Sequence, residues 1–258
     1  MSFQHFQSIM GYEALSPAEH VGQFFAELSL SIDKFNAKHF GNSIHTVKIG
    51  KTFQELRAAE NYFNVSFKHI ASPVLFDPKR MSFADYVDLC CQTVGALKIV
   101  TTVAENVYRG IKTTAAKGQV PVSMTSRDTA LIVFAMKEKS DEFLSTGNPT
   151  TRAVSEMYGN WGIADTTFQL FNKAVDSLKG RDVEILDKSV REVVAISALL
   201  KRKLSSGEIT LTEAQKDILN ESLDMLGQLV TYVGFMMNNL SELSRVMTLQ
   251  IEQLPKLK

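Results

Sequence analysis

The feature that most constrains the fold is a helical hydrophobic repeat that runs from Leu219 to Leu254. Steps of three and four residues in alternation give eleven positions, nine of them apolar: Leu219, Ser222, Leu226, Leu229, Val233, Met236, Leu240, Leu243, Met247, Gln250 and Leu254. A second stripe, one position further on, widens the apolar face beyond that of a two-stranded coiled coil. The pattern predicts one helix of about 40 residues, about 60 Å long, in the interior of a multi-helix bundle.

The ends of this helix carry signals of their own. Thr210, with Glu213 three residues later, predicts a capping box, and Pro255 predicts the end. A turn at Ser205-Ser206-Gly207 folds the preceding helix, Asp182–Leu204, back along the first half of the long helix. Because that helix reaches only about 33 Å, the stripe beyond Val233 needs a different cover. The cover is either a helix elsewhere in the chain or another subunit.

A second long repeat begins after Ser82 and Asp85, which form a helix start. Its apolar face continues without a break over more than thirty residues, to about Lys117, and is formed by Phe83, Tyr86, Cys90, Thr93, Leu97, Val100, Ala104, Val107, Ile111 and Thr114. This helix could supply the missing cover within the chain.

The other predicted elements are shorter. They are a helix over Ser16–Gly41, a helix from Thr52 to Phe63, a few short strands near 44–75, a linker over Gly118–Arg127, and helices over Asp128–Leu144, Thr150–Met157 and Asp165–Leu178. The predicted class is all-α, an elongated antiparallel helical bundle with long heptad-patterned helices. We expect an N-terminal helical half, 1–120, and a C-terminal bundle, 121–258, with one continuous elongated domain as the alternative.

Composition sets the class of protein. Of 258 residues, 45% are hydrophobic and 22% are charged, as is ordinary for a folded chain. The 28 basic and 28 acidic residues cancel, so the overall charge does not call for nucleic acid or an anionic membrane as partner. One segment is locally basic, with Glu105 as its single acidic residue: Lys98, Arg109, Lys112, Lys117 and Arg127.

The compartment follows from the cysteines and the N-terminus. Cys90 and Cys91 are adjacent within a predicted helix, where their side chains diverge, so they are expected to be buried and reduced. Met1 to Met10 has no signal-peptide pattern. The longest uncharged apolar run, Ala130–Met136, is seven residues, far below a membrane span. We expect a protein made in a cytoplasm, with no stable membrane span.

A search for chemistry gives no catalytic, cofactor-binding or metal-ligating residue. The five histidines, His5, His20, His39, His45 and His69, match no ligand spacing. The glycines at 159 and 162 lack the lysine and the preceding strand of a phosphate-binding loop. Cys90 has no positive neighbour at helical spacing that would lower its pKa. The prediction is a protein that is not an enzyme and carries no cofactor.

The long helix contains the best candidate interaction site. Met225–Ser241 is free of formal charge for seventeen residues, which favours the centre of a bundle or an oligomer seam. Gln228, Asn238 and Asn239 make it too polar for the hydrocarbon of a membrane. The candidate interaction residues are Leu226, Leu229, Val233, Met236, Leu240, Leu243 and Met247.

Three N-terminal segments carry a likeness to a known class of proteins: His20–Phe25, Ile32–Asn36 and Phe40–Val47. These segments resemble helical virion structural proteins of tailed bacteriophages. The resemblance implies a non-enzymatic component of the phage particle, internal to the head or at the neck, present in many copies and made in the bacterial host cytoplasm. It transfers no functional residues.

The sequence thus leads to three hypotheses. The first is a structural protein of the virion that assembles with copies of itself or with other virion proteins. The second is a membrane-active or ejected helical protein that exposes Met225–Ser241. The third is a helical protein that binds nucleic acid through Lys98, Arg109, Lys112, Lys117 and Arg127.

Overall fold

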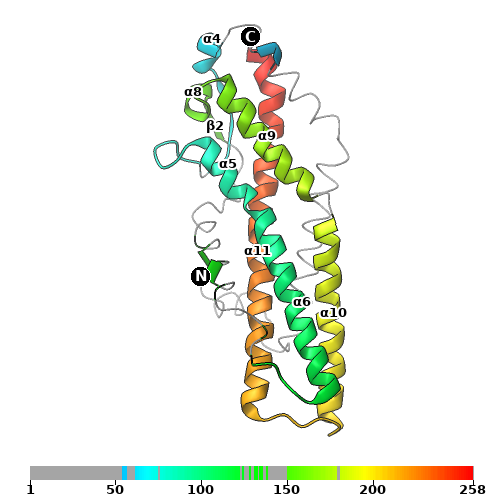
Figure 1. Cartoon of the computed structure of the whole chain (residues 1–258). Coiled ribbons are helices and arrows are strands. Elements are labelled where there is room, and N and C mark those ends of the chain that lie inside the picture. The colour runs from blue at the N-terminus through cyan, green and yellow to red at the C-terminus, as the bar shows by residue number, and fades with distance from the viewer. Residues whose placement is uncertain are drawn as a thin grey trace. The chain divides into compact units, whose positions relative to one another are not determined.

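A computed structural model describes residues 54–56, 62–74, 76–122, 150–178 and 181–257, with single positions between 124 and 138. Most of these residues are helical, and they include one two-stranded sheet (Figure 1). The predicted mainly helical class is therefore confirmed. The predicted helix Ser16–Gly41, most of the predicted helix Asp128–Leu144 and the segments that resemble virion proteins lie outside the described residues.

Contacts between Cα atoms divide the chain into two compact units. Described residues from Leu97–Phe134 and Asp182–Gly234 belong to the first unit. Those from Ser31–Ala96, Ala135–Arg181 and Phe235–Lys258 belong to the second unit. Both units combine segments that are distant in sequence. The predicted division into residues 1–120 and 121–258 stays a prediction.

Three long helices supply the described part of the first unit: α6 (Thr93–Lys117) from Leu97 onward, α10 (Arg181–Ser205) after its first residue, and α11 (Glu213–Gln253) as far as Gly234. Gly207, at φ 73°, lies in the short turn that joins α10 to α11. Gly118, at φ 65°, follows α6, and a Cβ there would lie 3.7 Å from Cγ2 of Ile209. The C-terminal ends of α6 and α10 therefore meet at one end of this unit (Figure 1).

The core of the first unit is an apolar face from each helix. Every predicted stripe position of α6 is buried, from Leu97 to Thr114. In α10 the buried face is Leu186, Val190, Val193 and Leu200. Full burial of one such aliphatic side chain contributes about 1.5–3 kcal/mol, so these faces account for the packing of the helices.

The second unit combines short elements with the last part of α11. Helix α5 (Phe83–Cys91) packs against α9 (Trp161–Leu178). Strand β1 (His69–Ser72) pairs antiparallel with β2 (Thr150–Ala153), in a register that sets Ile70 opposite Arg152. The short helices α4 (Tyr62–Ser66) and α8 (Val154–Met157) lie beside the sheet, and the 3₁₀ helix η1 (Leu254–Leu257) follows α11.

Aromatic rings fill the core of the second unit. Phe83 lies 5.2 Å from Phe76, 5.5 Å from Tyr158 and 6.1 Å from Tyr86, measured between ring centroids. Tyr158 in turn lies 6.2 Å from Phe168 of α9. Edge-to-face and stacked pairs at these distances add about 0.5–1.5 kcal/mol each beyond their buried area. The cluster fixes α5 to α9 and to the loop that follows β1.

The second long repeat is interrupted, which the sequence did not predict. Ser82 caps α5 as expected, with its Oγ accepting from the Asp85 amide at 3.1 Å, but α5 ends at Cys91 and α6 begins at Thr93. The Thr93 hydroxyl donates to the Cys90 carbonyl at 2.7 Å and to the Met236 carbonyl at 3.3 Å. Such a bond from Thr to the preceding turn bends helices. The apolar stripe continues through the interruption, as the burial of its positions on both sides shows.

Two predicted helix starts were wrong. Helix α11 begins at Glu213, and its capping box is formed by Thr212 and Gln215, whose reciprocal bonds are 3.3 and 3.0 Å, in place of Thr210 and Glu213. Helix α9 begins at Trp161, because Asn160 Oδ1 accepts from the Ile163 amide at 3.0 Å. A side-chain oxygen that reaches a free amide decides the start, and the sequence offered more than one such side chain at each helix.

The predicted helix Thr150–Met157 was also wrong in its first half. Residues 150–153 form β2, and only Val154–Met157 is helical. Two threonines favour an extended chain, and pairing with β1 satisfies the backbone groups of both segments.

Candidate interaction site on helix α11

The structure places all seven candidate interaction residues inside the chain. Leu226, Leu229 and Val233 belong to the first unit, and Met236, Leu240, Leu243 and Met247 belong to the second. Each is at most 3% exposed. As the chain is folded here, these side chains contact its own residues, and a partner could reach them only if the surrounding helices moved.

The cover of the distal half of α11 comes from the same chain. The Met236 carbonyl accepts from Thr93 at the start of α6, and the Lys68 ammonium donates to the Leu257 carbonyl of η1. The sequence left two possible covers open, a helix elsewhere in the chain or another subunit. These contacts favour a helix of the same chain. Strand β1 adds a cover that the stripe pattern did not predict.

A buried polar network ties α11 to this strand. Gln250 is fully buried, and its Nε2 donates to the Ala71 carbonyl at 2.6 Å while its Oε1 accepts from the Tyr158 hydroxyl at 2.5 Å. Gln253 Oε1 accepts from the Ala71 amide at 2.8 Å. The two glutamines therefore satisfy both backbone groups of Ala71 on the edge of β1 that faces away from β2. Gln250 was a polar exception in the predicted stripe, and this network explains it.

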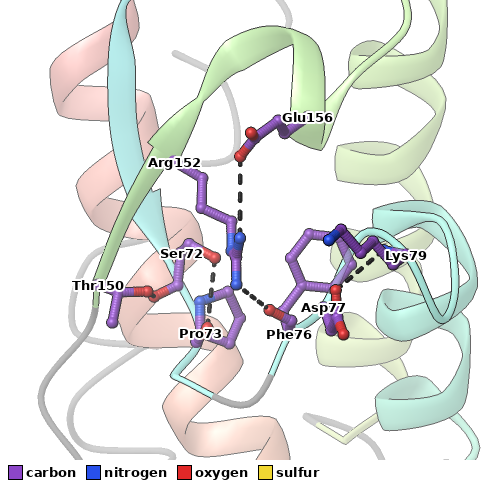
Figure 2. Close-up of polar contacts among 8 residues, drawn as sticks. All are labelled: Ser72, Pro73, Phe76, Asp77, Lys79, Thr150, Arg152 and Glu156. Carbon is purple, nitrogen blue, oxygen red and sulfur yellow. Dashed lines mark hydrogen bonds and ion pairs between the residues drawn. The ribbon is translucent and has the colours of Figure 1, made fainter.

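Arg152 anchors the other strand, as Figure 2 shows. Its Nη2 donates to the Phe76 carbonyl at 2.7 Å, its Nη1 lies 3.8 Å from Glu156 Oε2, and its guanidinium lies 5.8 Å from the centre of the Phe76 ring. The Thr150 hydroxyl donates to the Ser72 carbonyl at 3.5 Å. These contacts hold the loop after β1 against β2, which is a structural role.

Among the described residues, several buried thiols and phenols have perturbed pKa values. Burial raises the pKa of the Cys91 thiol to about 12, with a smaller contribution from Asp88. Burial also raises the pKa of Cys90, Tyr86 and Tyr158. A raised pKa keeps each of these groups neutral near pH 7, so none of them is a reactive thiolate or phenolate there.

The described residues contain no group of three or more His, Cys, Asp or Glu side chains that could hold a metal ion. His69 lies exposed on β1. The other four histidines lie outside the described residues.

The predicted basic set lies on the outside of α6. Lys98, Arg109, Lys112 and Lys117 are exposed, whereas Arg127 lies outside the described residues. Arg109 pairs with Glu105 at 3.5 Å, and the Lys112 ammonium lies 5.4 Å from the centre of the Tyr108 ring. The structure therefore places these four exposed cations on one helix.

The uncharged segment Met225–Ser241 lies within α11, and most of its apolar side chains are buried. A different stretch, Phe83–Lys117, is long and apolar enough to cross a membrane by length and composition. Half of its most apolar window is buried, and a core helix of a soluble protein passes the same test.

Sequence reasoning missed an exposed aromatic pair. Phe63 and Phe67 on and after α4 are 76% and 69% exposed, and their rings meet edge to face at 5.7 Å. Helical spacing of four residues was the available signal, but it does not tell an outward face from an inward one in so short a helix.

Comparison with known proteins adds no assignment. No protein-family model matches the chain, and neither the curated proteins nor the solved structures gave a match.

Proposed function

We propose that this protein is a non-enzymatic structural protein that works through the packing of long helices. The observation that supports this proposal best is the continuity of burial along two stripes. All ten stripe positions from Phe83 to Thr114 and all eleven from Leu219 to Leu254 are buried. Most of the stability of helices in proteins comes from the packing of such apolar faces, so these stripes serve to hold the long helices together.

The proposal includes the finer architecture and the setting expected from the sequence. The architecture is an elongated antiparallel bundle with heptad-patterned helices. The setting is the virion of a tailed bacteriophage, internal to the head or at the neck, with copies of the chain or other virion proteins as partners. The resemblance of residues 20–47 supports the setting.

In this proposal the seven stripe residues of α11 serve the bundle itself. Their exposure of at most 3% leaves no surface for a partner, so contacts between copies use side chains outside the stripe. Of the two uses predicted for the stripe, the centre of a bundle and an oligomer seam, the proposal adopts the first.

The test combines two measurements. We expect mass spectrometry of purified phage particles to find the protein in many copies, and light scattering on the purified protein to show self-association at high micromolar concentration. A protein that is absent from particles and stays a strict monomer would remove the proposal.

A second candidate function, membrane activity, is favoured by one observation. The stretch Phe83–Lys117 has the length and composition of a membrane span. Such a function requires that its buried apolar face become exposed to lipid. Dye release from liposomes at neutral and at acidic pH tests this candidate, and no leakage under either condition would end it.

A further inference from the structure

The exposed face of α6 in the first unit carries three cations and one carboxylate. Lys98, Arg109 and Lys112 follow one another at spacings of eleven and three residues, which place them within about 60° of each other around a helix. They extend over about 21 Å, and Glu105 is the acidic residue between them. Cations in the last turn of a helix are often explained by the helix dipole, but this effect fades within one turn. Lys98 and Arg109 lie more than one turn before the end of α6, beyond the reach of this effect, and Arg109 pairs with Glu105 at 3.5 Å.

The end of α10 extends this surface. A Cβ added at Gly118, next to Lys117, would lie 3.7 Å from Cγ2 of Ile209. The Ile209 amide donates a hydrogen bond to the Lys203 carbonyl at 3.3 Å. The last turns of α6 and α10 are therefore neighbours at one end of the first unit. Lys201 and Arg202 are exposed there, while the Lys203 ammonium is 2.6 Å from Glu208. Positive charge thus gathers where the two helices end.

We propose that this basic surface, formed by Lys98, Arg109, Lys112 and Lys117 of α6 and by Lys201 and Arg202 of α10, binds the phosphate backbone of nucleic acid without reading its sequence. A DNA duplex carries one phosphate charge per about 1.7 Å of its axis, so about twelve phosphates pass along a row of 21 Å. An extended row of cations matches such a polyanion better than it matches a single small phosphate.

The rest of the face favours nucleic acid over a lipid surface. Between Lys98 and Lys117 the other exposed side chains of α6 are small or polar: Thr102, Asn106, Thr113 and Ala116. A helix that binds a membrane surface inserts large apolar side chains below the headgroups. This face offers none, whereas a phosphate backbone needs only cations and hydrogen-bond donors.

The experiment measures the affinity of the full-length protein for a labelled random duplex by fluorescence anisotropy, between about 50 and 200 mM salt. Each phosphate contact contributes about −0.9 to the slope of log K against log salt. We expect a steep slope for the wild type. In Lys201→Gln/Arg202→Gln and in Arg109→Gln/Lys112→Gln we expect the slope to be shallower by about 2, with affinity reduced about equally for all sequences.

The matched control is Lys79→Gln/Arg80→Gln. It also removes two adjacent positive charges, from exposed positions of the loop before α5 in the second unit. We expect it to keep the wild-type slope. All substituted residues are exposed, and circular dichroism verifies that each variant is folded.

Three results would overturn the proposal: no binding at the lowest salt, an unchanged slope in both test variants, or the same loss in the control. Vesicles containing phosphatidylserine form the last arm. Binding to vesicles without binding to the duplex would assign the surface to lipid and would likewise overturn the proposal.

Discussion

At the scale of single residues, the best-defined feature is the pair of bonds that Gln250 makes. Its two partners, Ala71 and Tyr158, lie 179 and 92 positions away in sequence. A helical repeat can mark Gln250 as a polar position on an apolar face, but nothing local identifies partners so distant. The buried polar network therefore emerges only from the structure.

Gln250→Leu is expected to lower the free energy of unfolding by about 2–6 kcal/mol, because the buried Ala71 carbonyl and Tyr158 hydroxyl each lose a partner at about 1–3 kcal/mol. Urea denaturation measures the loss. Gln228→Leu makes the same chemical change at a half-buried position of the same helix and should cost far less. In a double-mutant cycle with Tyr158→Phe we expect a coupling of about 0.5–3 kcal/mol. Strictly additive losses would show that the two side chains do not interact.

Cys91 predicts how stability responds to alkaline pH. Burial raises its pKa from 9.0 to about 12, so between these values the folded chain keeps a proton that the unfolded chain has released. The unfolded state then binds fewer protons, and the free energy of unfolding falls as pH rises through this window, by up to about 1.4 kcal/mol per pH unit for one group. Denaturation curves at several pH values should show a shallower fall for Cys91→Ala. Equal slopes for variant and wild type would contradict a buried, neutral thiol.

At the scale of helices and strands, the sequence predicted inward faces better than boundaries. Every stripe position of the two long repeats is buried, because the 3–4 spacing reports the face of a helix directly. Strand β2 was missed because Thr150–Ala153 has no alternating pattern and its burial is slight, so only the pairing with β1 reveals it. The interruption at Gln92 was missed because it leaves the apolar spacing on either side of it undisturbed.

Glycines inside the long helices give a test of element stability. A Cβ added at Gly95 of α6 or at Gly234 of α11 would meet nothing within 4 Å. Alanine at each position should raise the free energy of unfolding by about 0.5–1 kcal/mol, since it removes backbone freedom from the unfolded chain. At Gly110 the added Cβ would lie 2.5 Å from the Met124 sulfur, which is buried. Gly110→Ala should therefore destabilise the protein, by about 1–3 kcal/mol.

Thermal and urea denaturation of the three alanine variants measure these changes. Equal stability of Gly110→Ala and the other two variants would show that the Met124 side chain does not pack against Gly110 of α6.

At the scale of the whole molecule, the chain covers its own apolar stripes. The seven candidate interaction residues are buried on one face of α11, but sequence alone could not tell whether that face meets the same chain or a second copy. The decisive contacts come from β1 and from the start of α6, which are far from α11 in sequence. The exposure of the basic residues of α6, in contrast, could be predicted from the sequence, because they lie opposite the buried apolar face of the same helix.

The central claim, that the stripe of α11 is the core of a single chain, is tested most directly by replacing Leu240 and Leu243 with Asp. Both side chains are fully buried. Truncation alone of a buried leucine costs about 2–5 kcal/mol, and a buried unpaired carboxylate costs more. The control, Asn220→Asp with Asn238→Asp, adds two carboxylates to exposed positions of the same helix and should remain folded.

Circular dichroism and light scattering on the two double variants give the answer. We expect Leu240→Asp/Leu243→Asp to lose its cooperative unfolding transition and most of its helical signal, while the control keeps both. A variant that stays folded and changes only from oligomer to monomer would contradict this claim and would identify the stripe as a seam between copies.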